Sequence, residues 1–207
     1  MWVNVMNKND KVIKIIFIFV FVILIVPVLF KVVLDMTRDV VPEEISKIDY
    51  YGYTLSNSDT KLYKDTYKEL EDVLNNEVID YKSYASLLSK LFIIDVFTLN
   101  NKLTSTDIGG LEFVHDDFDD NFKEYLGSSL YNHVQSNIDG NRSQKLPVVK
   151  SVNVNSVFET KFDYNDNQYN AYLVKCNFNY EEDLGYQTNI TLTVINDNNV
   201  LYVVKGE

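Results

Sequence analysis

Hydrophobic residues are concentrated in one uninterrupted run close to the start of the chain. Ile15 to Phe30 are sixteen residues without a charge, and the run reaches twenty residues at Leu34 if the single interruption at Lys31 is included. A helix of that length is about 30 Å long, which is the thickness of the hydrocarbon core of a bilayer. Buried helices of soluble proteins rarely contain more than about ten to fourteen continuous apolar residues. The pattern therefore predicts one transmembrane helix over residues 13–34.

Three segments downstream of this run repeat their apolar positions with the 3.6-residue period of a helix. The first begins after Ser58 or Asp59, either of which is a suitable N-cap, and the second begins after Asp80. The sequence LFIIDVF in the second segment is apolar on nearly every side, which is typical of a helix inside a core. The third helix is expected over residues 115–138, with aspartates in its first turns, where the helix dipole favours negative charge.

After Pro147 the pattern changes to the alternation of β-strands. Four segments alternate between apolar and polar residues, and they read VVKSVNVNSVF, NAYLVKCNFNY, TNITLTVI and VLYVV. The sequences between them, YNDNQ, EEDLGY and NDNN, are typical of tight turns. Helices followed by an antiparallel meander predict an α+β domain, in which about three helices pack on the concave side of a curved antiparallel sheet of about four strands.

The residues that flank the apolar run indicate the orientation of the chain. Lys8, Lys11 and Lys14 precede the run, whereas Lys31 and Arg38 follow it among four acidic residues. Since Lys and Arg favour the cytoplasmic side of a membrane, the N-terminus is predicted to be cytoplasmic and the bulk of the chain to lie outside. We expect an N-terminal tail, a transmembrane helix, a linker and an extracytoplasmic domain, at residues 1–12, 13–34, 35–57 and 58–207.

A cleaved signal peptide is the alternative to a retained anchor. The basic start fits a signal peptide, but cleavage also needs a site of small residues. The sequence that follows Phe30, KVVLDMTRDVVPEE, contains neither Ala nor Gly, and no Cys is present there for lipid attachment. The flanks therefore favour a single-pass protein of the cell membrane with an uncleaved anchor.

Composition restricts the partners of the domain. The net charge of the chain is −11, and all of it lies after residue 49, because the first 49 residues contain six basic and six acidic groups. Phosphate binding needs clustered Lys and Arg, so nucleic acid is excluded as a partner. Cys176 is the only cysteine, so no disulfide can form within the chain and stability must come from packing.

The order of the elements is that of a known fold family. An anchor followed by three helices and four antiparallel strands resembles domains with the nuclear-transport-factor-2 fold, and the anchored version is similar to the assembly subunit of type IV secretion and conjugation machines. The segments KLFIIDVFTLNNK, GGLEFVHDDFDDNFK and QKLPVVKSVNV resemble those of a recurring set of uncharacterised single-pass proteins of Gram-positive bacteria. The first resemblance implies a cone-shaped domain within an envelope complex, and neither resemblance implies site residues.

Two histidines are the first candidates for site chemistry. His115 and His133 are the only histidines of the chain, and His115 stands next to several aspartates, namely Asp116, Asp117, Asp119 and Asp120. Zinc sites need three or four ligands and usually more His or Cys than this. We therefore expect His115 near a helix cap rather than in a metal site.

The other candidates also have simpler structural explanations. Residues 163–167 and 196–199 are rich in Asp and Asn, but they lack the twelve-residue pattern of a calcium loop and are expected to be hairpin turns. Cys176 lies in an alternating apolar register, which predicts a buried thiol and not a nucleophile. The sequence therefore predicts no catalytic residue, no cofactor site and no metal site.

Two functions are consistent with these expectations. The first is a non-enzymatic docking or scaffold component of a bacterial envelope complex, such as conjugation or secretion machinery, which contacts membrane lipid through residues 13–34 and binds protein partners, with oligomerisation left open. The second is a small-ligand-binding or enzymatic domain that uses a pocket in the cone. A deep pocket with converging polar groups would favour the second function, and a filled cone with an exposed apolar patch would favour the first.

Overall fold

The computed structural model describes residues 25–27 and 44–207 of the chain. Contacts divide the chain into two units, Met1–Val41 and Pro42–Glu207, and the longer described segment belongs to the second unit. The predicted N-terminal tail and transmembrane helix, together residues 1–34, lie outside the described residues apart from 25–27, which are helical. Within the described segments, no helix is both long enough and apolar enough to cross a membrane.

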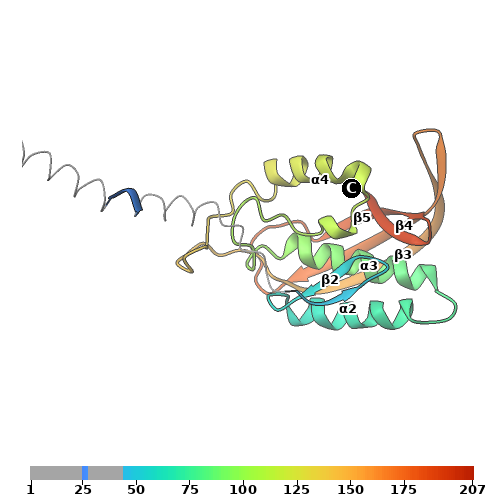
Figure 1. Cartoon of the computed structure of the whole chain (residues 1–207), viewed down its shortest axis with the longest axis horizontal. Helices are drawn as coiled ribbons and strands as arrows, with labels where there is room; N and C mark the ends of the chain where they lie inside the picture. The colour runs from blue at the N-terminus through green and yellow to red at the C-terminus, as the bar shows by residue number, and fades with distance from the viewer. Residues whose placement is uncertain (1–24, 28–43) are drawn as a thin grey trace, which may run out of the picture. The chain divides into compact units, whose positions relative to one another are not determined.

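The second unit has the predicted α+β class (Figure 1). Its helices precede a four-stranded antiparallel meander of order β3-β4-β5-β6, and a separate two-stranded hairpin, β1-β2, comes first. The elements in chain order are β1 (Glu44–Ile48), β2 (Tyr53–Ser56), α2 (Lys61–Leu74), α3 (Tyr81–Phe97), the 3-10 turn η1 (Leu111–Phe113), α4 (Asp116–Ser128), β3 (Val149–Tyr164), β4 (Asn167–Tyr180), β5 (Asn189–Asp197) and β6 (Val200–Gly206).

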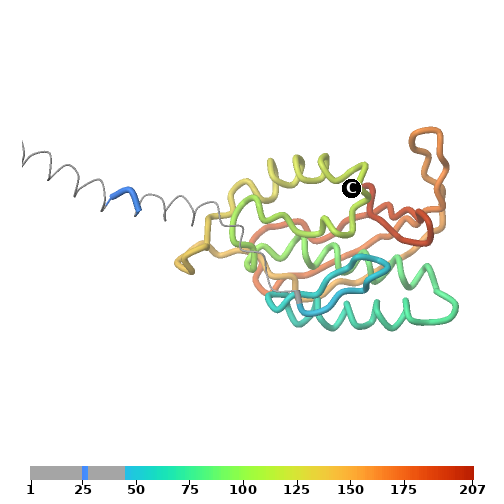
Figure 2. The backbone as a smooth tube through the Cα atoms, in the orientation of Figure 1, coloured from blue at the N-terminus to red at the C-terminus, as the bar shows by residue number. Residues whose placement is uncertain are grey.

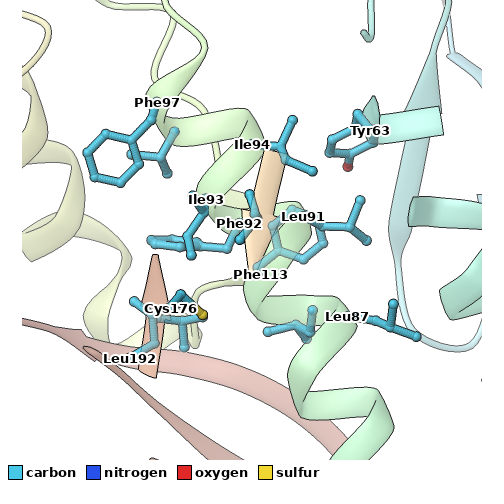
Figure 3. Packing of buried hydrophobic residues seen from close by; sticks show 14 of the residues in the cluster. Tyr63, Leu87, Leu91, Phe92, Ile93, Ile94, Phe97, Phe113, Cys176 and Leu192 are labelled. Carbon is cyan, nitrogen blue, oxygen red and sulfur yellow. The ribbon is translucent and has the colours of Figure 1, made fainter. Parts of the chain in front are cut away.

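Helix α3 is the centre of the core, as its apolar sequence predicted. It contacts all four strands of the larger sheet on one side, and α2 packs against it on another. Eleven of its seventeen residues are buried. Figure 3 shows side chains on more than one side of this helix. Phe97 points away from Tyr63 of α2, and Cys176 and Leu192 of the sheet lie below the helix.

Two of the predicted turns are confirmed with their backbone conformations. Asn165 and Asp166 both have positive φ, at 48° and 62°, and so do Asn198 and Asn199, at 51° and 69°. A two-residue hairpin loop with positive φ at both positions is a type I′ turn, which Asn and Asp tolerate better than other residues with a side chain. Figure 2 shows that the turn between β3 and β4 stands away from the rest of the sheet.

The region expected to be a linker up to residue 57 differs from that expectation. Strands β1 and β2 pair as an antiparallel hairpin. The first three residues of the motif YYGY lie in its turn, with Gly52 at φ +79°, and only Tyr53 is extended, as the first residue of β2. Tyr53 is fully buried, and its hydroxyl is satisfied there because it donates a hydrogen bond to the carbonyl oxygen of Leu201, at 2.8 Å. The hairpin is therefore part of the folded unit, which begins before residue 58.

The start of α2 also differs from the expected cap. Thr60 is the N-cap, and its hydroxyl accepts the backbone N–H of Tyr63 at 3.2 Å. Asp59 instead accepts the backbone N–H of Ser56 at 2.6 Å, so its carboxylate closes the turn after β2 and is not available to the helix. The predicted cap of α3 is confirmed, because Asp80 accepts the backbone N–H of Lys82 at 3.0 Å.

The third helix is shorter than the predicted range of residues 115–138. Helix α4 ends at Ser128, where Gly127 and two serines have lower helix propensity than the preceding residues. The backbone N–H of Tyr131 then bonds to the carbonyl oxygen of Leu126 at 2.9 Å, and the chain turns inward. This turn buries the Tyr131 ring completely and lets its hydroxyl donate to the carbonyl oxygen of Val96 at 2.8 Å. The stabilisation from burying this ring exceeds what further turns of an exposed helix would contribute.

Candidate functional site

Helix α4 is positioned by a histidine cap and by one apolar face. His115 is the N-cap, as predicted, and its Nδ1 accepts the backbone N–H of Asp117 at 3.3 Å. His115 also lies 3.5 Å from Asp197 through Nε2, which ties the start of the helix to the end of β5. Only Leu126 of α4 is buried, whereas Tyr125 is 71% exposed. The helix therefore covers its neighbours incompletely.

This incomplete cover leaves a cavity of about 500 Å³ between α4, α3 and the ends of β5 and β6. We call it the α4 groove. Three aromatic residues of α4 and two of α3 line it, and the side chains of Ile190 and Val204 come from the sheet. The apolar lining consists of Phe92, Val96, Phe97, Phe118, Phe122, Tyr125, Leu126, Leu130, Ile190 and Val204.

Ring contacts fix the two helical walls of the groove. Phe122 of α4 meets Phe92 of α3 edge to face, with ring centroids 5.9 Å apart. At the start of α4, Phe118 packs against Phe162 and Tyr164 of the β3–β4 hairpin, with ring centroids 6.1 and 4.7 Å apart. Such aromatic pairs stabilise a fixed geometry beyond the area that they bury. The groove is therefore a preformed apolar surface.

Four of the five polar side chains that line the groove, all except Asn121, are bonded within the protein. Lys205 and Glu207 form an ion pair with each other. Gln187 donates to the carbonyl oxygen of Asn189 at 2.6 Å, and the Ser129 hydroxyl donates to the carbonyl oxygen of Tyr125 at 2.5 Å. These groups do not converge on a common point with a nucleophile and a base, which is what catalysis requires. The groove can bind apolar groups, but it does not contain a catalytic constellation.

The sequence candidates are not brought together by the fold. Cys176 is buried on the core face of β4, His115 caps α4, and His133 is an exposed residue in the loop after α4. Among the residues that the structure describes, no group of three or more His, Cys, Asp or Glu side chains could hold a metal ion. The Asp- and Asn-rich segments at 163–167 and 196–199 contain the type I′ hairpin turns described above.

Burial governs the chemistry of the single thiol. It raises the pKa of Cys176 to about 12, so at neutral pH the side chain is a thiol and not the reactive thiolate. We expect a colourless aromatic disulfide reagent to label native protein at least a hundredfold more slowly than urea-unfolded protein, and Cys176→Ala to cost on the order of 1 kcal/mol of stability. Rapid labelling of the native protein would show that the thiol is accessible and would contradict this assignment.

A half-buried carboxyl group, which the sequence did not single out, joins β2, α2 and η1. Glu112 accepts the backbone N–H of Thr54 at 2.9 Å, the Thr54 hydroxyl at 2.6 Å and the Tyr63 hydroxyl at 2.7 Å. Burial nevertheless raises the pKa of Glu112 to about 7, against the opposite effect of these hydrogen bonds, and the nearby charge of Asp95 adds to the rise.

The geometry around Tyr63 also favours the protonated form of Glu112. The single hydroxyl proton of Tyr63 has two acceptors in reach, Glu112 at 2.7 Å and the carbonyl oxygen of Thr54 at 3.2 Å. When Glu112 is ionised, Tyr63 can donate to one of them only. When Glu112 is protonated, it donates to Tyr63, which then donates to Thr54, so both bonds form.

This raised pKa makes the stability depend on pH. Between pH 4.5 and 7 the folded protein keeps a proton that the unfolded chain releases, so the free energy of unfolding falls as the pH rises through this window. In Glu112→Gln the amide reproduces the neutral pattern, and we expect the variant to match the parent at pH 5 and to exceed it by on the order of 2–3 kcal/mol at pH 8. Urea unfolding at both pH values measures this difference. The exposed change Glu69→Gln is the control, and a constant difference between Glu112→Gln and the parent at both pH values would contradict the assignment.

Comparisons with known proteins give no relative from which a function could be transferred. No protein-family model, no curated protein and no solved structure matches this chain.

Proposed function

We propose that the protein is a membrane-anchored, non-enzymatic docking component of a bacterial envelope complex. The single observation that carries this proposal is the α4 groove, which is open and mostly apolar, and in which the side chains of Gln187, Ser129, Lys205 and Glu207 are bonded to the protein itself. Preformed apolar recesses of this kind mark interaction sites on otherwise polar surfaces. Conjugation or secretion machinery is the specific complex that we propose, on the resemblance of element order alone.

The anchor is the part of the proposal that rests on sequence. Its support is the charge-free run Ile15 to Phe30 and the basic residues before it. We expect the full-length protein to stay in the membrane fraction after carbonate washing, and added protease to digest the residues after 50 in intact protoplasts. Recovery of a soluble form that begins near residue 35, or protection of the domain from protease, would contradict the anchor or its orientation.

Photo-crosslinking tests the docking function. A photoreactive amino acid at position 125, in the exposed mouth of the groove, should form an adduct of one defined mass with another envelope protein in the native membrane. The matched control is position 78, where Val78 is 85% exposed on the loop between α2 and α3, away from the groove. Equal yields of the same adducts from both positions would show that the groove is not the docking site.

A small apolar ligand is the second candidate function. The observation that favours it is the volume of the groove, because cavities of about 300–1,000 Å³ are typical of small-molecule sites. Native mass spectrometry of the protein released gently from its membrane tests it. A bound species of discrete small mass, lost in Phe122→Ser, would favour the ligand over the protein partner.

A further inference from the structure

The outer edge of β6 is occupied at Leu201 and Val203, just before the end of the strand that lines the groove, which restricts how a partner can bind there. The backbone N–H of Leu201 donates to the hydroxyl of Tyr84 at 3.2 Å, and its carbonyl oxygen accepts from Tyr53. The carbonyl oxygen of Val203 accepts the backbone N–H of His115 at 3.2 Å. A partner strand needs a run of free backbone groups to extend a sheet, and these contacts leave only the last residues of β6, so we infer that a partner of the groove binds through side chains.

A helix is the element that binds in this way. Amphipathic helices place apolar side chains at positions i, i+3, i+4 and i+7 into hydrophobic grooves and need no backbone hydrogen bonds from the receptor. The α4 groove has room for a few such side chains between the aromatic residues of α3 and α4. The ring of Tyr125, which is 71% exposed, stands at its mouth and can contact an incoming helix.

The charges beside the groove favour a partner of one charge. Helix α4 carries five acidic residues and one lysine, and that lysine, Lys123, is paired with Asp119 at 2.5 Å. Asp117 and Glu124 are exposed, and they lie four residues before and three residues after Asn121, so the three form one row along the lip of the groove. Negative charge at the lip favours Lys and Arg on a partner and disfavours fatty acids and anionic lipid surfaces.

We propose that the α4 groove binds a cationic amphipathic helix of a partner protein, with the apolar side chains of that helix in the groove and its Lys or Arg residues facing Asp117 and Glu124. This inference rests on the proposed docking function and adds to it the class of the partner. The apolar contacts supply most of the affinity, because a few buried anchors dominate interface energies. The charges supply the preference for a cationic partner and speed its association.

Fluorescence anisotropy with designed peptides tests this inference. The probe is a labelled eighteen-residue amphipathic helix of Leu, Ala, Gln and Lys, added to full-length protein in phosphatidylcholine nanodiscs, with empty nanodiscs as the blank. Peptides in which Glu replaces Lys, and in which the sequence is scrambled, are the two peptide controls. We expect the cationic helix to bind, the scrambled peptide to bind at least tenfold more weakly and the anionic helix not to bind.

Matched variants of the protein distinguish binding at the groove from a general attraction to an acidic protein. Tyr125→Ser should weaken binding about tenfold, and the pair Asp117→Asn with Glu124→Gln about fivefold with a smaller salt dependence. The pair Asp72→Asn with Glu69→Gln removes the same charges from the exposed side of α2 and should leave binding unchanged. Equal weakening by the two charge pairs, or unchanged binding in Tyr125→Ser, would overturn the inference.

Oleate, as a second probe, and the crosslinking experiment at position 125 distinguish this inference from its alternatives. If oleate binds and the cationic helix does not, the groove is a site for small apolar ligands and the inference is overturned. If neither probe binds but position 125 still crosslinks to a protein in the native membrane, the partner class is wrong while the docking function stands. If both the peptide and the crosslink fail, the docking function falls as well.

Discussion

Replacing Lys102 by methionine is expected to lower the free energy of unfolding by about 3–5 kcal/mol. The Lys102 side chain is 9% exposed, and its Nζ lies 2.5 Å from Oδ1 of Asp95. Burial is the largest single influence and lowers the pKa of Lys102, but the charge and hydrogen bond of Asp95 act together with Tyr131 and Asp107 in the opposite direction. Their sum outweighs burial, so the pKa of Lys102 is raised and its side chain is charged. Methionine fills similar space without a charge and leaves the Asp95 carboxylate with the backbone N–H of Gly110, at 2.6 Å.

Urea unfolding of the full-length protein in detergent, followed by circular dichroism, measures this loss. The control is Lys61→Met, which breaks an exposed ion pair with Asp65 on α2 and should cost less than about 1 kcal/mol. Adding Asp95→Asn to Lys102→Met should recover part of the loss, because it removes the uncompensated charge and keeps an acceptor for Gly110. Equal losses in Lys102→Met and Lys61→Met would show that the buried pair does not stabilise the fold.

Gly109→Ala is expected to cost about 3 kcal/mol or more, through a clash with the backbone of α3. A Cβ at Gly109 would lie 2.4 Å from the carbonyl oxygen of Asp95 and 2.7 Å from Nζ of Lys102. A helix carbonyl cannot move aside, so the loop must move instead. That movement breaks the bond from the Gly109 N–H to the Tyr131 hydroxyl, at 3.0 Å, and strains the neighbouring ion pair.

Thermal unfolding of Gly109→Ala beside Gly127→Ala tests whether close packing is the cause. A Cβ at Gly127 would meet its nearest neighbour, Ile108, at 3.5 Å, which is ordinary contact, and alanine is the better helix former. We therefore expect Gly127→Ala to raise the melting temperature and Gly109→Ala to lower it by 10 °C or more. A melting temperature of Gly109→Ala close to that of the parent would contradict the proposed clash.

The sequence predicts the elements that local pattern determines. Helix α3 followed from a run that is apolar on all sides, and the hairpin turns followed from Asn and Asp residues that tolerate positive φ. The end of α4 could not be predicted in this way, because it depends on a buried site for Tyr131 that α3 and the loop at Gly109 create together. The β1–β2 hairpin was missed for the same reason, since Tyr53 finds its hydrogen-bond partners in α3 and β6.

The candidate site could not be predicted from the local sequence pattern. The α4 groove exists because α4 meets α3 and the ends of strands that follow it by about sixty to eighty residues in the sequence, and it covers them incompletely. Glu112 and Asp95 carried a weak signal that could have been used. Each is a single acid within an apolar sequence, GGLEF and LFIIDVF, where a charge must find partners if the segment is buried.

The central claim is that the protein acts by docking a partner in the α4 groove. The most direct measurement is the mass of the protein extracted with mild detergent from its native membrane, for the parent, Tyr125→Ser and Cys176→Ala. We predict that the parent and Cys176→Ala run in one complex well above the 24.0 kDa of a single chain, and that Tyr125→Ser is released from it while its amount and folding stay unchanged. Release of Cys176→Ala, or retention of Tyr125→Ser in the complex, would contradict the claim.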